Sequence, residues 1–330
     1  MLVSFFDILQ LTNYLLYLNV QYQSILYNII KLFDFANFEF IPNISNNNSN
    51  SPFKFRMEKI DTFIYSNLIQ SVVIWVFSFL VYIISKLIVR KFIHSKNFLI
   101  EALRSYQTEY FFQVIVGLGF LTYCDLLLSV FLQFYDSANM TTSQLVGVIS
   151  AIILLLGIIR LNILTLQSTR IQTYQLIYND KIKSLYGYLY SGIEMNQKKA
   201  IMNLLFLFRK TIVIQQLVFN QSNPINQAYI CCLCVGIEFT VMLILRPYKS
   251  QYEQRLHLAS RFLMISSMIL IIVLAINDSI SNISSSIQNL ISIFVAVQLL
   301  VIYFTQVCYL VFQLYQTLRR RYVLNDSKLV

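Results

Sequence analysis

Five charged side chains stand inside long apolar runs, where a charge is costly unless it is paired or hydrated. They are Asp125, Arg160, Arg209, Lys210 and Glu238. Such charges serve as an ion or proton path, as a gating contact, or as structural salt bridges with snorkelling of the long cations. A voltage sensor would need several cations at every third position of one helix, and Arg209-Lys210 is a single adjacent pair. We set that class aside and leave the other interpretations open.

The remaining side chains with metal-binding or nucleophilic chemistry form no recognisable catalytic arrangement. The two histidines, His94 and His257, lie beside the ends of apolar runs in basic surroundings, so we expect them to be solvated. The cysteines all fall within apolar stretches, which favours buried thiols over a disulfide framework, acylation or a metal site; they are Cys124, Cys231, Cys232, Cys234 and Cys308. No Gly-rich phosphate loop and no HExxH motif occurs. We predict no catalytic residue, metal or cofactor, and a protein that is not an enzyme.

The composition indicates that these residues sit on membrane-spanning helices. Of 330 residues, 57% are hydrophobic and 12% are charged, whereas a soluble domain carries about 25% charged residues. Seven Gly and four Pro leave little material for the turns of a β-rich fold. The net charge of +10 comes from cations clustered beside apolar runs, which is typical of topology signals rather than of a nucleic-acid surface. The predicted fold class is an all-α polytopic transmembrane bundle in a lipid bilayer.

Seven segments are long and apolar enough to span about 30 Å of hydrocarbon. They cover residues 63–85, 111–134, 145–166, 201–219, 229–245, 263–276 with its flanks, and 290–314. Hydropathy alone does not decide 201–219, because Arg209 and Lys210 lie near its middle. If this segment spans, the loops 135–143, 220–228 and 277–289 all lie on the lumenal side. They contain no Lys or Arg, as the positive-inside rule predicts for that side. The carboxyl terminus is then cytosolic.

The chain divides into four parts around these spans. Residues 1–33 are apolar but interrupted by polar residues, among them Asp7, Gln10, Asn13, Asn19, Gln21 and Gln23. They form either an eighth, N-terminal span, which we expect, or an interfacial helix. Residues 34–61 form a lumenal loop rich in Asn, residues 62–316 the seven-span domain, and residues 317–330 a basic cytosolic tail.

Two local motifs support this topology. Arg246-Pro247-Tyr248-Lys249 predicts the end of a span, since proline stops the helix, the cations face the cytosol and the tyrosine anchors at the headgroups. Asn-x-Ser/Thr sequons, candidates for glycosylation in a glycoprotein, fall on the proposed lumenal side; they begin at Asn43, Asn47, Asn139, Asn220, Asn277 and Asn282. A further sequon, at Asn325, falls in the proposed cytosolic tail.

The order of these features resembles the carboxyl-terminal membrane domain of ciliate-type surface proteins that carry cysteine-rich repeats, a domain distantly similar to fungal TRP-like proteins. The matching pieces are Ile8-Leu9-Gln10-Leu11 with Asn13-Tyr14-Leu15 and Leu18-Asn19-Val20, then Phe40-Ile41-Pro42-Asn43, Phe208-Arg209-Lys210 with Gln215, and Leu245-Arg246-Pro247-Tyr248-Lys249. Two features depart from the pattern: this sequence lacks the cysteine-rich ectodomain, and Tyr22-Gln23-Ser24 stands where the pattern favours proline. The resemblance implies a multi-span protein of the plasma membrane or endomembrane system, channel-like and without catalytic residues.

We therefore expect a non-enzymatic multi-pass protein engaged in TRP-like ion transport or sensing. The alternatives are a seven-span receptor-like protein and a structural subunit of a larger membrane assembly, and homo-oligomers are compatible with each. Helix rise places Arg209 and Glu238 at similar depths, roughly 15 and 12 Å from the cytosolic boundary. We predict that Glu238 pairs with Arg209 or Lys210, with Arg160 as a third member of the group.

Overall fold

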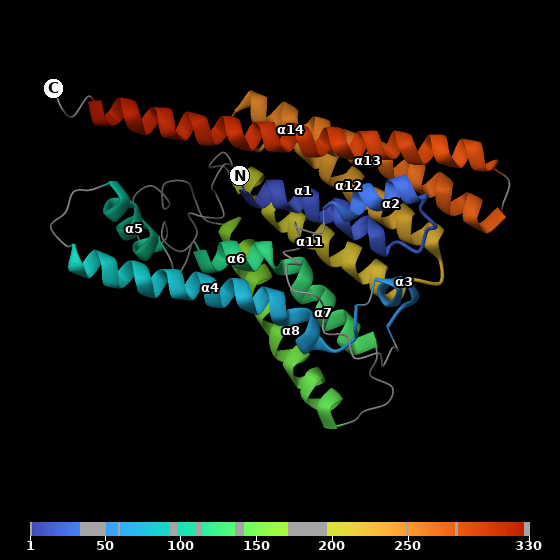
Figure 1. Ribbon diagram of the computed structural model, residues 1–330, viewed down its shortest axis with the longest axis horizontal. Helices are drawn as coiled ribbons and strands as arrows, with labels where there is room; N and C mark the ends of the chain where they lie inside the picture. The colour runs from blue at the N-terminus through green and yellow to red at the C-terminus, as the bar shows by residue number, and fades with distance from the viewer. Residues whose placement is uncertain are drawn as a thin grey trace.

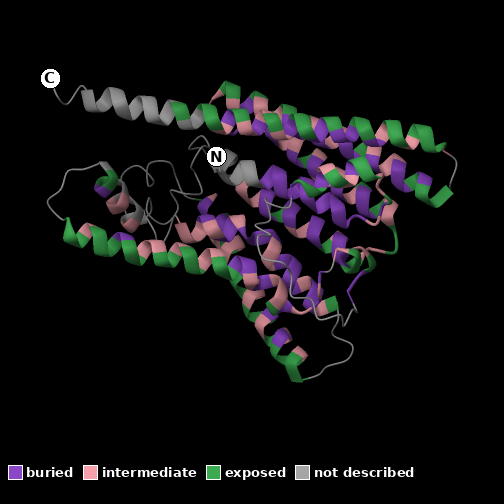
Figure 2. Cartoon of the chain, in the orientation of Figure 1, coloured by how far each residue is buried: buried purple, intermediate pink, exposed green. Residues whose placement is uncertain are grey.

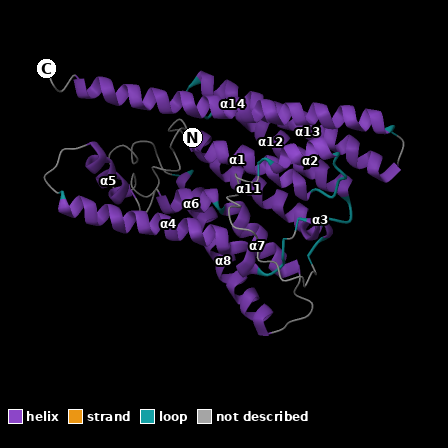
Figure 3. Ribbon diagram, in the orientation of Figure 1, coloured by secondary structure: helices purple, strands orange, loops and turns teal. Residues whose placement is uncertain are grey.

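The structure is a computed structural model in which helices joined by loops make up the described part, as Figures 1 and 3 show. It describes residues 2–33, 51–58, 60–92, 98–109, 114–135, 142–170, 197–248, 250–280 and 283–326. Within these ranges no β-strand occurs. The predicted all-α class is confirmed for this part of the chain.

Six helices are long and apolar enough to cross a membrane. They are α4 (Ile64–Lys91), α8 (Thr142–Ser168), α11 (Gln197–Phe219), α12 (Pro224–Leu245), α13 (Gln251–Ile280) and α14 (Ser285–Asp326). The segment Ile201–Phe219 qualifies in spite of its two central cations, so the span that hydropathy left undecided is present as a continuous helix. The chain has the helices of an integral, multi-pass membrane protein.

The segment predicted as a clear span over 111–134 is broken. Its described part consists of α6 (Ile115–Leu121) and α7 (Tyr123–Tyr135), which meet at an angle of 58°. At the joint, the Thr122 hydroxyl donates to the Leu118 carbonyl at 2.9 Å and accepts from Trp75 Nε1 at 3.3 Å. Such back-bonding by threonine bends helices. The prediction of seven firm spans therefore becomes six continuous spans plus one broken pair.

The N-terminal segment lies inside the bundle. It forms α1 (Leu2–Tyr14), the 3-10 turn η1 (Leu15–Tyr17) and α2 (Ser24–Lys31). Every residue from Asp7 to Leu18 is buried, and Figure 2 shows this region as the purple centre of the molecule. With 13 residues, about 20 Å of rise, α1 is too short to cross a bilayer by itself. The segment is a central helix followed by a turn, and the eighth span that we expect in residues 1–33 stays a prediction.

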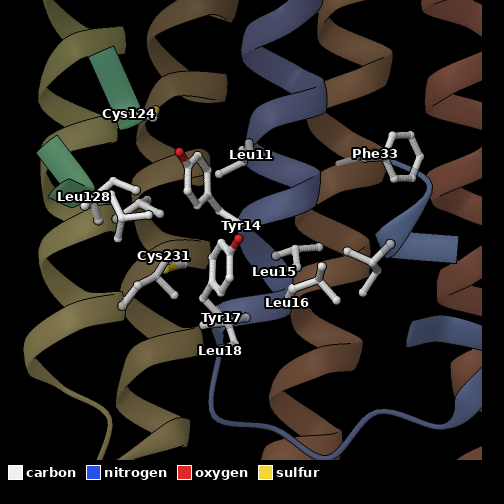
Figure 4. Packing of buried hydrophobic residues seen from close by; sticks show 14 of the residues in the cluster. Leu11, Tyr14, Leu15, Leu16, Tyr17, Leu18, Phe33, Cys124, Leu128 and Cys231 are labelled. Carbon is white, nitrogen blue, oxygen red and sulfur yellow. The ribbon is translucent and has the colours of Figure 1, made fainter. Parts of the chain in front are cut away.

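Hydrogen bonds fix the end of this segment near the loops that we predict to be lumenal. The Asn19 side chain donates to the Gln221 carbonyl at 2.8 Å, and the Asn19 backbone N–H donates to Gln227 Oε1 at 2.9 Å. The Gln21 N–H donates to Asp278 Oδ2 at 2.7 Å. The chain then turns back, and α2 packs along α14. Figure 4 shows Tyr14 and Tyr17 on the side that carries Cys124 and Cys231.

The outlying helices differ in burial. In the 18-residue apolar stretch of each span, only 6% of the residues of α4 and 17% of those of α8 are buried, against 50% in α11. Helices α4 and α8 are therefore peripheral.

Two short helices, α3 (Phe53–Met57) and α5 (Phe98–Glu109), complete the described part. Phe55 of α3, within the predicted loop 34–61, is buried and stacks on Tyr17 with ring centroids 4.8 Å apart. Helix α14 continues past residue 317, into the predicted tail.

Candidate functional site: a buried charge network

Four side chains from four helices form a closed ring of alternating charge. Asp7 of α1 contacts Arg209 Nη2 at 2.5 Å through Oδ1 and Arg261 Nη2 at 2.7 Å through Oδ2. Glu238 of α12 pairs with Nη1 of Arg209 through Oε2 and lies 2.7 Å from Arg261 Nε through Oε1. Each acid thus contacts both arginines. The ring connects α1 with α11, α12 and α13.

Lys210 is the fifth member of the site. Its ammonium lies 3.5 Å from Asp7 Oδ1 and 3.3 Å from both Gln10 Oε1 and the Phe120 carbonyl. We call Asp7, Arg209, Lys210, Glu238 and Arg261 the charge network. All five side chains are at most 5% exposed. The network holds three cations and two acids, so its formal charge is +1.

The surroundings of the network stabilise its cations and strengthen the attraction between its charges. Both guanidinium groups lie 5.9 Å from the centroid of the Phe206 ring, within the range of cation–π attraction. A cavity of about 10 Å³ borders Asp7, Arg209 and Lys210, which is room for about one water molecule. Water is otherwise excluded at this burial, so the ionic contacts act at a low effective dielectric.

The broken span places polar groups next to the network. The Tyr14 hydroxyl of α1 donates to Asp125 Oδ1 at 2.8 Å, and Asp125 lies in the first turn of α7, directly after the break. The Tyr123 hydroxyl is 2.9 Å from Thr211 Oγ1 of α11 and receives a hydrogen bond of 3.1 Å from Asn162 of α8. Together with the contact from Trp75 of α4, these bonds connect the joint between α6 and α7 to four other helices.

The ion pair that the sequence predicts between Glu238 and Arg209 is present. Lys210 contacts Asp7 rather than Glu238. Arg160, the predicted third member of the group, is exposed on α8 and forms no ion pair with any described residue. Arg261 is the third member instead. Depth along a helix can be read from the sequence, whereas the direction in which a side chain points depends on packing.

Sequence reasoning missed two of the five members. Asp7 is predicted only as a polar interruption of the N-terminal segment, and Arg261 is not among the predicted intramembrane charges. One signal was available: the predicted set of intramembrane charges contained three cations and only two acids. An unbalanced cation in the membrane is costly, so another acid was needed, and Asp7 is the only acidic residue within residues 1–33 of the apolar N-terminal stretch.

His257 is a correction to the predicted solvated histidine. It is 4% exposed and stacks on Tyr248, with ring centroids 4.2 Å apart. The predicted helix end is present: α12 ends at Leu245, and Arg246 adopts a φ of 46° with its N–H 3.1 Å from the Met242 carbonyl. Because the chain turns back here, Tyr248 reaches His257 of the next helix. His94 and Lys249 lie outside the described residues.

The glycosylation candidates Asn43, Asn47 and Asn139 also lie outside the described residues. Asn277 is buried, and its side-chain oxygen accepts a hydrogen bond from the Ile283 N–H at 2.7 Å, so it is not accessible for a glycan in this fold. The five cysteines are free thiols. In the described ranges, no group of three or more His, Cys, Asp or Glu side chains is placed to hold a metal ion.

Comparison with known proteins finds no matching family model, no matching curated protein and no matching solved structure.

Proposed function

We propose that this protein is a non-enzymatic membrane protein that conducts or gates ions, with the charge network as its gating element. The observation that carries the proposal is the closed ring of Asp7, Arg209, Glu238 and Arg261. Burying ions is expensive, and apolar residues of similar volume often stabilise a fold as well or better. By contrast, ion pairs that join four helices can differ between two alternative arrangements of a bundle, so they can stabilise one arrangement over the other.

The broken span supports the same proposal. Discontinuous helices in membrane transport proteins supply ends and polar groups in the bilayer interior. Here the break leaves Asp125 in the first turn of α7, hydrogen-bonded to Tyr14 of α1. A movement of α7 relative to α1 would change both the Asp125 contact and the position of the helix that carries Asp7. We propose that this coupling opens and closes the conduction path.

The proposal includes the expected orientation, with a cytosolic carboxyl terminus, and the resemblance to TRP-like membrane domains of ciliate-type surface proteins. The receptor-like alternative is less well supported, because α1 fills the bundle centre where a receptor of this class would bind its ligand. In a structural subunit, the ring would serve only to hold the four helices together.

Electrophysiology tests the proposal. The purified chain in planar bilayers should give unitary conductance, with a reversal potential in a salt gradient that identifies the sign of the permeant ion. Asp125→Asn should alter open probability while leaving the protein folded, and Cys308→Ser, at an exposed thiol of α14, is the matched control. Silent bilayers from monodisperse, folded protein would refute ion conduction and leave the structural-subunit alternative.

A further inference from the structure

We propose that a groove between α4, the broken pair α6 and α7, and α8 binds one anionic phospholipid, with its acyl chain in the groove and its phosphate on Arg160. The groove is lined in part by the peripheral helices α4 and α8, and two of its lining residues, Gly119 and Tyr123, adjoin the polar contacts beside the charge network. Its volume is about 460 Å³, within the range of about 300–1,000 Å³ that is usual for ligand pockets.

The walls of the groove suit a hydrocarbon chain. Val72 and Trp75 of α4, Val116 of α6 and Leu154 of α8 are among the residues that form them, and Arg160 is the one charged side chain in the lining. Two of the helices that line the groove, α4 and α8, are the two least buried spans. In a bilayer, an open apolar groove is filled by hydrocarbon, because an empty one forfeits dispersion contacts along its walls.

The positive charge of Arg160 favours a lipid with an anionic headgroup. A cation within a span costs several kcal/mol unless an anion compensates it, and Arg209 and Arg261 each have two carboxylate partners. Arg160 has none among the described residues. Helices α4 and α8 contain no Asp or Glu, and the acid of α7, Asp125, is bonded to Tyr14 of α1. Among the described residues, the walls of the groove therefore offer Arg160 no carboxylate partner.

A phosphate ester is the anion that the bilayer provides in quantity, and guanidinium binds phosphate through two parallel hydrogen bonds. Arg160 and the apolar walls together match a molecule that is anionic at one end and apolar at the other. Gly157 lies one turn before Arg160 on α8, is exposed, and has no atom within 4 Å of the position that a Cβ would take. The backbone is thus open to the groove beside the cation.

Native mass spectrometry of the purified full chain tests the proposal, with phosphatidylglycerol and phosphatidylcholine as probes. We expect one tightly bound phosphatidylglycerol and weaker binding of phosphatidylcholine. Arg160→Gln should weaken phosphatidylglycerol binding by about tenfold or more, as expected for loss of a charge-assisted contact. Gly157→Leu, which fills the groove and keeps the charge, should weaken binding of both lipids.

Arg90→Gln is the matched control, because Arg90 is an exposed arginine at the end of α4 and outside the groove. Its binding should equal that of the unmodified chain, and all three variants should keep their thermal unfolding midpoint in lipid-free detergent. Equal losses in Arg90→Gln and Arg160→Gln would show general surface attraction and overturn the proposal. So would a dimer that dissociates on Arg160→Gln without a change in lipid binding, because the anion would then belong to a second copy of the chain.

Discussion

Glu238→Gln is expected to destabilise the bundle more than Arg209→Gln, although the two side chains are partners in one ion pair. The reason is the charge balance of the network. Removing Glu238 raises the formal charge from +1 to +2 and leaves both arginines with Asp7 alone. Removing Arg209 lowers the charge to zero, and both acids keep Arg261. The closed ring therefore predicts an asymmetry that an isolated pair would not show.

The magnitudes follow from the contacts. Loss of one partner from a buried ion pair costs about 3–5 kcal/mol, which we expect for Glu238→Gln. Arg209→Gln removes two charge-assisted contacts but leaves no acid unpaired, so we expect about 1.5–3 kcal/mol. The double substitution restores the formal charge of +1. Its cost should fall short of the sum of the single costs by about 0.5–3 kcal/mol.

The assay is the unfolding equilibrium in mixed micelles as the fraction of denaturing detergent rises. Arg255→Gln is the control, because Arg255 is an exposed arginine on α13, the helix that also carries the buried Arg261. We expect it to change the free energy of unfolding by no more than about 0.5 kcal/mol. Strictly additive costs, or a Glu238→Gln variant as stable as Arg255→Gln, would refute the ring as an energetic unit.

Two further predictions concern packing and orientation. Gly147→Ala should lower the unfolding midpoint, because its Cβ would lie 2.7 Å from Gln133 Oε1, which accepts the Ile64 N–H at 3.0 Å; Gly236→Ala, with no atom within 4 Å, should be neutral or stabilising. In sealed vesicles, a tag after Val330 should be cleaved by protease on the cytosolic side while an insertion at residue 139 is protected, and the reverse pattern would contradict the predicted topology.

Helix rise and charge placement were sufficient to predict the contact between Arg209 and Glu238. The two residues lie on consecutive spans joined by a short loop, and short loops favour antiparallel neighbours. Arg160 shows where this reasoning stops. Its depth is similar, but it points away from the bundle, and depth carries no information on which face of a helix packs inward when the helix is apolar all round.

The break at Thr122 is invisible to hydropathy for a related reason. A window average is unchanged when a helix bends, because the same residues still lie within the bilayer. At the bend, Thr122 makes a local hydrogen bond to the Leu118 carbonyl and a tertiary contact with Trp75 of α4, and neither enters a hydropathy average. The burial of His257 likewise depends on the turn at Arg246, which returns Tyr248 to the side of α13.

The break and the charge balance are connected through Lys210. This residue is the surplus cation of the network, since its single acidic contact, at 3.5 Å, is to an Asp7 that already serves two arginines. The Lys210 ammonium also lies 3.3 Å from the Phe120 carbonyl of α6, two residues before the break. A straight helix through Thr122 would continue along the axis of α6, whereas the 58° bend starts α7 in a new direction, with Asp125 against Tyr14 of the helix that carries Asp7. The broken span thus brings an acidic side chain, Asp125, into contact with α1 through Tyr14.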